Sequence, residues 1–351
     1  MLGFFLRRLV WAVGLFLVVT LYTYVLFFLL GRTSVNIGNR SAGESAEAVT
    51  VADSVGVHGS LLEAYVGFLG KVVTGDLGQS FYSREEVTSI IARAAPVTAS
   101  LVFGAAILWL LIALPIGVLS ALHPRSLLDR AGMVFVLVGI SAHPLWIGYI
   151  LSWLLGYKLR WFPVNGYCDV FSASTSCGGP VQWTYHLFLP WLTFALGFAA
   201  VYARMIRASL AETLSEDYVR TAHAKGLGTW AVVRGHALRN AATPVATMLG
   251  MDIGLAFAGA VFVERVFGLP GVGSLLYQSL GRRDLPVILG IVILVCTGIL
   301  VFNLLVDLVY ALLDPRVRLT APRAGRAGAA RSTATGGSTP QPAPAASGST
   351  G

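Results

Sequence analysis

The chain has 351 residues, of which 56% are hydrophobic and only 12% are charged, and its mean hydropathy is +0.73. Soluble domains carry charge on about a quarter of their residues, so this composition excludes an ordinary soluble protein and indicates an integral membrane protein. The formal net charge is +8. In a membrane protein this excess reflects topology and anionic lipid, so membrane lipid is an expected partner and nucleic acid is not.

Six apolar runs are long enough to cross a hydrocarbon core of about 30 Å, which takes about 20 helical residues. They lie near residues 9–30, 97–122, 131–156, 186–208, 244–267 and 286–313. Their apolar character is continuous rather than alternating, which favours helices over barrel strands. The composition therefore predicts an all-α polytopic membrane protein with six transmembrane helices. We interpret the first run as a retained helix rather than a signal peptide.

The distribution of Lys and Arg sets the expected orientation. With a cytoplasmic N-terminus, the cytoplasmic side carries fifteen cations against five acids, and the other side carries ten of each. Both termini are therefore expected in the cytoplasm, and residues 209–243 form a cytoplasmic loop.

Four regions follow from this topology. They are a first helix at 1–31, an external domain at 32–95, a five-helix core at 96–319 and a disordered cytoplasmic tail at 320–351. The external domain contains a pattern that suits an amphipathic helix near the membrane surface, although a small soluble packing helix would show the same pattern. Its members are Leu61, Leu62, Tyr65, Phe68 and Leu69.

Cysteines and histidines offer little chemistry. Cys168 and Cys177 share the external loop between the third and fourth spans, where an oxidising compartment would allow a disulfide, with two free thiols as the alternative. Cys296 lies in the sixth span and is expected to pack. The histidines are scattered and none has a helical ligand spacing, so no metal site is expected.

A polar stretch, EDYVRTAHAKGLGTWAVVRGHALRN at 216–240, lies between two apolar blocks. Ala222 and Gly226 are four residues apart and share one helical face. We predict a helix over 216–224 that stops at Gly226, followed by a second helical run at 231–240. A short helix with a small-residue face suits a groove in another protein, while a solvated loop is the alternative.

This stretch resembles the cytoplasmic signature of ATP-binding-cassette importer permeases, which reads E-A-A, three residues, Gly, nine residues, I-x-L-P. The residues in that register are Arg220, Thr221, Ala222, Gly226, His236, Leu238 and Arg239. The form D-Y-V-R-T-A-x-A-K-G-L is similar to the dipeptide, oligopeptide and nickel branch. Further motifs of that branch are GDLGQSF at 75–81, RAAPVT at 93–98, VERVFGLPGVGSLL at 263–276, RDLPVI at 283–288 and LVDLVYALLDPRVRL at 305–319.

The resemblance implies a type I importer permease in a bacterial cytoplasmic membrane, with an external domain and a cytoplasmic coupling helix. Its implied partners are a second, related permease, two ATP-binding subunits that hold ATP and Mg, and an external peptide-binding protein. The chain itself would be neither an enzyme nor a cofactor carrier. It contains no catalytic group that we single out and no G-x-x-x-x-G-K-[ST] loop.

The resemblance also assigns residues. The coupling segment would contain Arg220, Thr221, Ala222, Lys225, Gly226, Leu227 and His236. An external-face motif would contain Glu264, Phe267, Pro270, Gly271 and Gly273.

One carboxylate in the membrane suggests a substrate path. Asp252 lies in the middle of the fifth span, where an ionisable group costs about 2.5–3.5 kcal/mol and is a functional candidate. Gly250 and Gly254 flank it at a spacing that suits close helix packing. Asp252 could attract a peptide's amino terminus, or it could be capped by a neighbouring helix or protonated. In the third span, His143 and Pro144 predict a kink.

Three other functions have some support in the sequence. Nickel or another small solute could replace peptide in the same type of importer. An ion-driven secondary transporter would explain Asp252 without an ATPase, but would not explain the coupling segment. An intramembrane protease using Ser274 lacks a second catalytic group. Peptide length and side-chain preference stay open.

Overall fold

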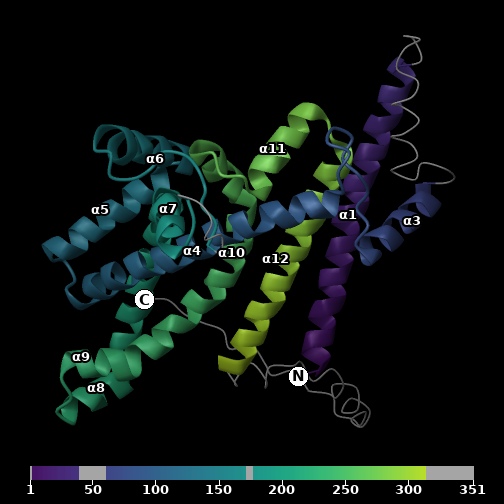
Figure 1. Cartoon of the computed structure of the whole chain (residues 1–351). Helices are drawn as coiled ribbons and strands as arrows, with labels where there is room; N and C mark the ends of the chain where they lie inside the picture. The colour runs from purple at the N-terminus through teal and green to yellow at the C-terminus, as the bar shows by residue number, and fades with distance from the viewer. Residues whose placement is uncertain (1, 39–60, 171–176, 314–351) are drawn as a thin grey trace, which may run out of the picture. The chain divides into compact units, whose positions relative to one another are not determined.

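The computed structural model describes residues 2–38, 61–170 and 177–313, and within them the structure is almost entirely helical (Figure 1). Part of the predicted external domain, residues 39–60, and the predicted tail at 320–351 lie outside the described residues. The helices are α1 (Leu2–Gly38), α3 (Leu61–Thr74), α4 (Val87–Leu122), α5 (Leu127–Ser141), α6 (Pro144–Leu151), the π-helix η1 (Ser152–Lys158), α7 (Pro180–Leu214), α8 (Asp217–Ala224), α9 (Thr229–Val232), the π-helix η2 (Val233–Ala237), α10 (Leu238–Phe267), α11 (Val272–Arg282) and α12 (Leu285–Leu313).

Five of these helices contain a segment long and apolar enough to cross a membrane, in α1, α4, α7, α10 and α12, and a bent pair can supply a sixth span. The fold class predicted from composition is confirmed. The fifth span at 244–267 has the predicted bounds. By contrast, α4 begins at Val87 rather than near residue 97, so it extends into the segment that the sequence assigned to the external domain.

The third predicted span is wrong as a single helix. The chain bends by 107° between α5 and the α6–η1 helix. His143 has extended backbone angles, because the ring of the following Pro144 disfavours the helical conformation at the residue before it. The imidazole Nδ1 then accepts a hydrogen bond from Leu145 N at 3.3 Å and caps the new helix. The predicted kink is therefore a complete break.

The core lies where α4 packs against α7. The fully buried Trp109 stacks on Phe198 with ring centroids 4.6 Å apart. A Cβ added at Gly104 would lie 2.1 Å from the Trp191 ring, whose Nε1 donates to Ser100 O at 2.9 Å. Small residues thus let these two long helices approach closely, as is common in membrane bundles.

A partly buried ion pair ties α5 to α7. Arg207 donates from Nε to Asp129 Oδ1 at 2.6 Å and from Nη2 to Asp129 Oδ2 at 2.9 Å. Asp129 also accepts from Arg125 N, and its own N–H donates to the Ser126 side chain that caps α5. This bidentate geometry fixes the start of α5 against α7.

The predicted amphipathic helix is present as α3, and it packs on α1. Tyr65 Oη donates to Leu17 O at 3.0 Å and lies 2.9 Å from Thr20 Oγ1. The Tyr24 ring contacts Tyr65 and Phe68, with centroids 5.6 and 5.2 Å away. These contacts hold α3 against the apolar helix α1, and its depth relative to the membrane surface stays a prediction.

Candidate functional site

The polar stretch after α7 folds as a short helical hairpin, formed by α8 and α9. Helix α8 ends in a left-handed glycine, Gly226, with φ +86°. The Gly226 N–H donates to His223 O at 2.9 Å, and the Leu227 N–H donates to Ala222 O at 3.3 Å. These two bonds are the Schellman arrangement, which satisfies the last carbonyls of a helix and favours glycine at the left-handed position. The predicted helix and its stop are observed.

The hairpin has its own small core, made of Val219, Ala222 and Val232 with Leu214 against it. Ala222 is only 6% exposed. The expectation that Ala222 belongs to a face open to a partner protein is therefore wrong. Its small side chain lets α8 pack against α9 instead.

Several of the other assigned residues lie on the outer face of the hairpin. Arg220, Thr221, Lys225 and Gly226 are exposed, and Arg220 pairs only loosely with Asp217, at 3.7 Å. His236 lies in η2, which continues from α9 into α10.

Large hydrophobic side chains are also exposed on this hairpin, among them Leu227 at 41% and Trp230 at 63%. The resemblance to the family placed Leu227 in the coupling segment, whereas the sequence analysis did not identify Trp230. The available signal was an isolated tryptophan in a polar segment, two residues beyond the turn. Tryptophan is enriched among the residues that dominate protein interfaces, whereas leucine is under-represented there, so Trp230 is the stronger candidate anchor.

The candidate path residues contact neighbouring helices. Tyr202 Oη, from α7, donates to Asp252 Oδ2 at 2.8 Å. A Cβ added at Gly254 would lie 3.4 Å from Ile299 of α12, and Gly250 is buried. Of the alternatives left open for Asp252, the contacts match a carboxylate capped by a neighbouring helix.

The external-face motif folds around a buried carboxylate. Glu264, at the end of α10, is 0% exposed. It accepts hydrogen bonds from Thr98 Oγ1 of α4 at 2.6 Å and from Ser274 N of α11 at 2.7 Å. Thr98 Oγ1 in turn accepts from Val272 N at 2.8 Å. The first turn of α11 is thereby fastened to α10 and α4.

The remaining motif residues leave room for this arrangement. A Cβ added at Gly271 would lie 2.2 Å from Glu264 Oε1, and one added at Gly273 would lie 2.5 Å from the backbone of Val261. Phe267 is buried, and Pro270 is exposed beside the turn into α11. The motif therefore encodes a tight joint between α10 and α11.

A second joint brings together two motifs that are far apart in the sequence. Asp284, between α11 and α12, is buried and accepts hydrogen bonds from Ser80 Oγ and from Phe81 N, the latter at 3.1 Å. The segment GDLGQSF therefore contacts RDLPVI. Sequence reasoning identified both motifs but not their pairing.

The loop before α7 is closed by a disulfide between Cys168 and Cys177, whose Cα atoms are 5.2 Å apart. His186 Nδ1 lies 3.3 Å from Cys168 Sγ. These three side chains offer ligand atoms within 4.8 Å of one another, although the sequence indicated that the histidines were isolated. Metal binding by cysteine requires the thiolate, so the bridged sulfurs are not ligands.

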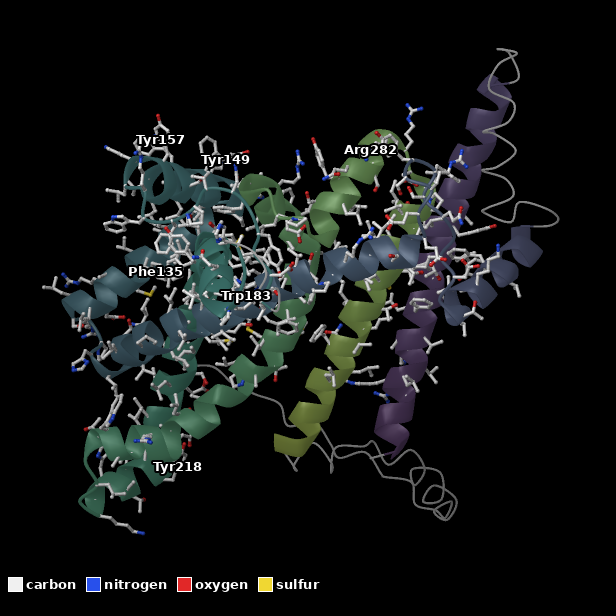
Figure 2. All side chains as sticks on the ribbon, in the orientation of Figure 1. Phe135, Tyr149, Tyr157, Trp183, Tyr218 and Arg282 are labelled. Atoms are coloured by element: carbon white, nitrogen blue, oxygen red, sulfur yellow. A yellow bond between two sulfur atoms is a disulfide. The ribbon has the colours of Figure 1, made fainter. Side chains whose placement is uncertain are left out.

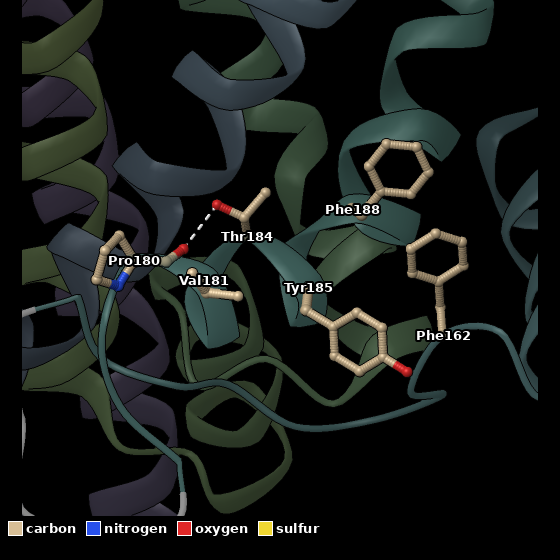
Figure 3. Close-up of a pocket in the computed structure, with 6 residues that line it drawn as sticks. All are labelled: Phe162, Pro180, Val181, Thr184, Tyr185 and Phe188. Atoms are coloured by element: carbon tan, nitrogen blue, oxygen red, sulfur yellow. Dashed lines mark hydrogen bonds between the residues drawn. The ribbon is translucent and has the colours of Figure 1, made fainter.

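Two hollows lie near this loop. One is apolar, about 490 Å³ in volume, and open to the surface (Figure 3). It is lined by Phe162, Pro180, Val181, Thr184, Tyr185 and Phe188.

The other hollow, of about 370 Å³, has Arg93 and Asp169 among its lining residues. Arg93 is paired with Glu85 at 2.6 Å, and this hydrogen bond lowers the pKa of the Glu85 carboxyl. Both residues of that pair are well exposed to solvent, so this contact stabilises the fold only weakly.

Comparison with known proteins places this geometry in a family. The family described as the binding-protein-dependent transport system inner membrane component matches residues 113–319, and its N-terminal region matches residues 1–102. Among curated relatives, the Pseudomonas aeruginosa di/tripeptide transport system permease protein DppB is 36% identical over 334 residues, covering 91% of this chain and 99% of that protein. The Escherichia coli K12 dipeptide transport system permease protein DppB is 34% identical over 337 residues, with the same coverage.

Solved structures agree at the level of the fold. An inward-facing form of the MetNI methionine ABC transporter aligns with a TM-score of 0.51 and 16% identity, covering 64% of this chain and 96% of that chain. The permease register of the α8–α9 hairpin, the helical membrane fold and these matches lead to one conclusion: the chain belongs to the binding-protein-dependent transport system inner membrane component family of ABC importer permeases.

Proposed function

We propose that this chain is a permease subunit of an ATP-driven importer that carries di- or oligopeptides across a bacterial cytoplasmic membrane. An external binding protein delivers the peptide. The chain pairs with a second, related permease, and two ATP-binding subunits hold ATP and Mg. Both termini lie in the cytoplasm, so the α8–α9 hairpin meets the ATPase subunits.

The hairpin is the observation that carries the coupling role. It connects α7 to α10, so a displacement of the hairpin acts on two membrane helices together. Its internal core and its Schellman turn make it a rigid unit, and rigid elements transmit a two-state change better than flexible loops. Leu227 and Trp230 supply exposed apolar contacts, while Arg220 and Lys225 supply charge around them.

The peptide substrate is supported by the relatives. Two that cover nine-tenths of this chain are named for dipeptide or di/tripeptide transport. The same family architecture would also serve nickel or another small solute, so the substrate needs its own measurement.

The function is tested by reconstitution. The chain is co-expressed with its sister permease, ATPase and binding protein, purified as a complex, and placed in liposomes. We expect ATP-dependent uptake of labelled peptides, with competition among di-, tri- and longer peptides defining the preferred length. Uptake of nickel that peptides do not inhibit would refute the peptide assignment. Uptake driven by an ion gradient without ATP would refute the importer assignment.

The coupling role is tested separately, in the same complex. Trp230→Ala and Leu227→Ala should each reduce binding-protein-stimulated ATP hydrolysis severalfold, because an interface anchor typically contributes more than about 1 kcal/mol. The control is Val73→Ala on α3, which also removes an exposed apolar side chain. A cysteine at exposed Thr221 should crosslink to the ATPase, whereas one at buried Val219 should not. If both alanine variants show normal stimulation of ATP hydrolysis and the Thr221 cysteine does not crosslink, the hairpin is a solvated loop without a coupling role.

A further inference from the structure

The α6–η1 helix has two unlike faces. Its buried face consists of the small residues Gly148, Ser152 and Gly156, at four-residue spacing. The exposed side carries Ile150 and Leu154 together with a row of aromatic side chains that are between 56% and 73% exposed. The aromatic side chains are Trp146, Tyr149, Trp153 and Tyr157. Figure 2 shows the labelled Tyr149 and Tyr157 rings projecting away from the ribbon.

Close packing on the small-residue face determines which way the aromatic rings point. A Cβ added at Gly148 would lie 3.2 Å from Val266 of α10 and 3.3 Å from Thr193 of α7. At Gly156 it would lie 2.6 Å from Val164, in the loop that follows. The helix is therefore pressed against the bundle on one side and cannot turn its aromatic face inward.

The exposed surface changes character at the bend. Along α5 the exposed large residues are aliphatic, as at Leu127, Val134, Leu137 and Val138. Beyond the 107° bend they become mainly Trp and Tyr. Aliphatic side chains suit lipid tails, whereas Trp and Tyr concentrate where the tails meet the headgroups.

Two cations follow the aromatic face. Lys158 Nζ lies 5.4 Å from the centre of the Trp153 ring, and both Lys158 and Arg160 are exposed. Cations close to interfacial aromatics are placed to reach lipid phosphates while their stems stay on apolar surface. An aromatic face bordered by basic residues matches a lipid headgroup region more closely than the centre of a bilayer.

We propose that α6–η1 lies in the plane of the membrane, at the external lipid interface, and that α5 alone makes the third crossing. The partner of the aromatic face is lipid: the rings lie at the boundary between tails and headgroups, and Lys158 and Arg160 contact phosphates. At about 1.5 Å per residue, α5 rises roughly 22 Å, which is less than the usual core of about 30 Å. Local thinning of the bilayer accommodates such a mismatch.

This arrangement concerns the topology of the chain and holds for any transported solute. A helix in the plane and a helix that dips into the membrane differ in how depth changes along the chain. Between residues 146 and 157, a helix along the membrane normal would change depth by about 16 Å. A helix in the plane would hold one face at nearly constant depth.

The test is a depth measurement with spin labels. Single cysteines replace Trp146, Tyr149, Trp153 and Tyr157 in a Cys296→Ser background, without reductant, so that the disulfide stays closed. The assembled complex is placed in bilayers, and each depth is obtained from the accessibility of the label to oxygen and to a polar nickel reagent. Cysteines at the exposed Leu127 and Val138 of α5 have the same separation in sequence and serve as the matched control.

We expect the four α6–η1 labels to agree in depth within about 4 Å, at the interface and with high oxygen accessibility, while the α5 pair differs by more than about 10 Å. A steady change of depth from residue 146 to 157 would show a membrane-dipping helix and overturn the proposal. Labels shielded from both reagents would show that protein covers the aromatic face, which would overturn it equally.

Discussion

Replacing Glu264 probes the joint that holds α11 against α4 and α10. Its carboxylate is fully buried and accepts from Thr98 Oγ1 and Ser274 N. In Glu264→Ala, the Ser274 N–H and the Thr98 hydroxyl lose their acceptor. Each buried unsatisfied group costs about 1–3 kcal/mol, so we expect the free energy of unfolding to fall by about 2–6 kcal/mol.

Glu264→Gln should be much milder. The amide oxygen can still accept from the first turn of α11, and the amide nitrogen can donate to Thr98 Oγ1, so no backbone group is left unpaired. Only the difference between charged and neutral hydrogen bonds is lost, which amounts to about 1–2 kcal/mol. The matched control is Glu212→Ala, which removes an exposed carboxylate from α7.

The assay is thermal unfolding of the purified permease in detergent, followed by tryptophan fluorescence. The midpoints should fall in the order wild type, Glu264→Gln, Glu264→Ala, with Glu212→Ala equal to wild type. A cycle that combines Glu264→Gln with Thr98→Val should be non-additive, because the two side chains share a hydrogen bond. If Glu264→Ala has the same unfolding midpoint as Glu212→Ala, or if Glu264→Gln lowers the midpoint as much as Glu264→Ala does, the hydrogen-bond network does not stabilise this joint.

Three further predictions address other parts of the chain. Gly226→Ala should destabilise the hairpin by about 1–2 kcal/mol, because the φ of Gly226 is positive. Gly228→Ala is the control and should not destabilise it, because Gly228 has a φ of −68° and open space where a Cβ would lie. Equal binding-protein-stimulated ATP hydrolysis in the two variants would contradict the coupling role of this turn. Asp252→Asn keeps an acceptor for the Tyr202 hydroxyl and should retain stability, so lower peptide uptake by this variant would indicate a role for the charge. Lower uptake in Tyr202→Phe alone would indicate that the contact serves packing. Alkylation without reductant should label Cys296 alone, and labelling of all three cysteines would contradict the bridge.

Much of the fold follows from local properties of the sequence. Whether a segment crosses a membrane depends on the summed hydropathy of its own residues, so five spans could be recognised without any contact information. The stop after α8 is equally local, because a left-handed turn needs glycine wherever the rest of the chain lies. His143 and Pro144 predict a kink from the sequence, but they do not predict its angle. The packing of Gly148 against α10 and α7 determines the direction of α6.

The candidate sites depended on tertiary contacts. Ala222 looked like part of an open face because its burial requires Val232, which reaches it only after the hairpin has closed. The partners of Glu264 and Asp284 lie 166 and 204 residues away, at Thr98 and Ser80. A buried polar group must find a hydrogen-bond partner, and the sequence alone indicates that need. Only the packing of the helices decides which distant side chain meets it.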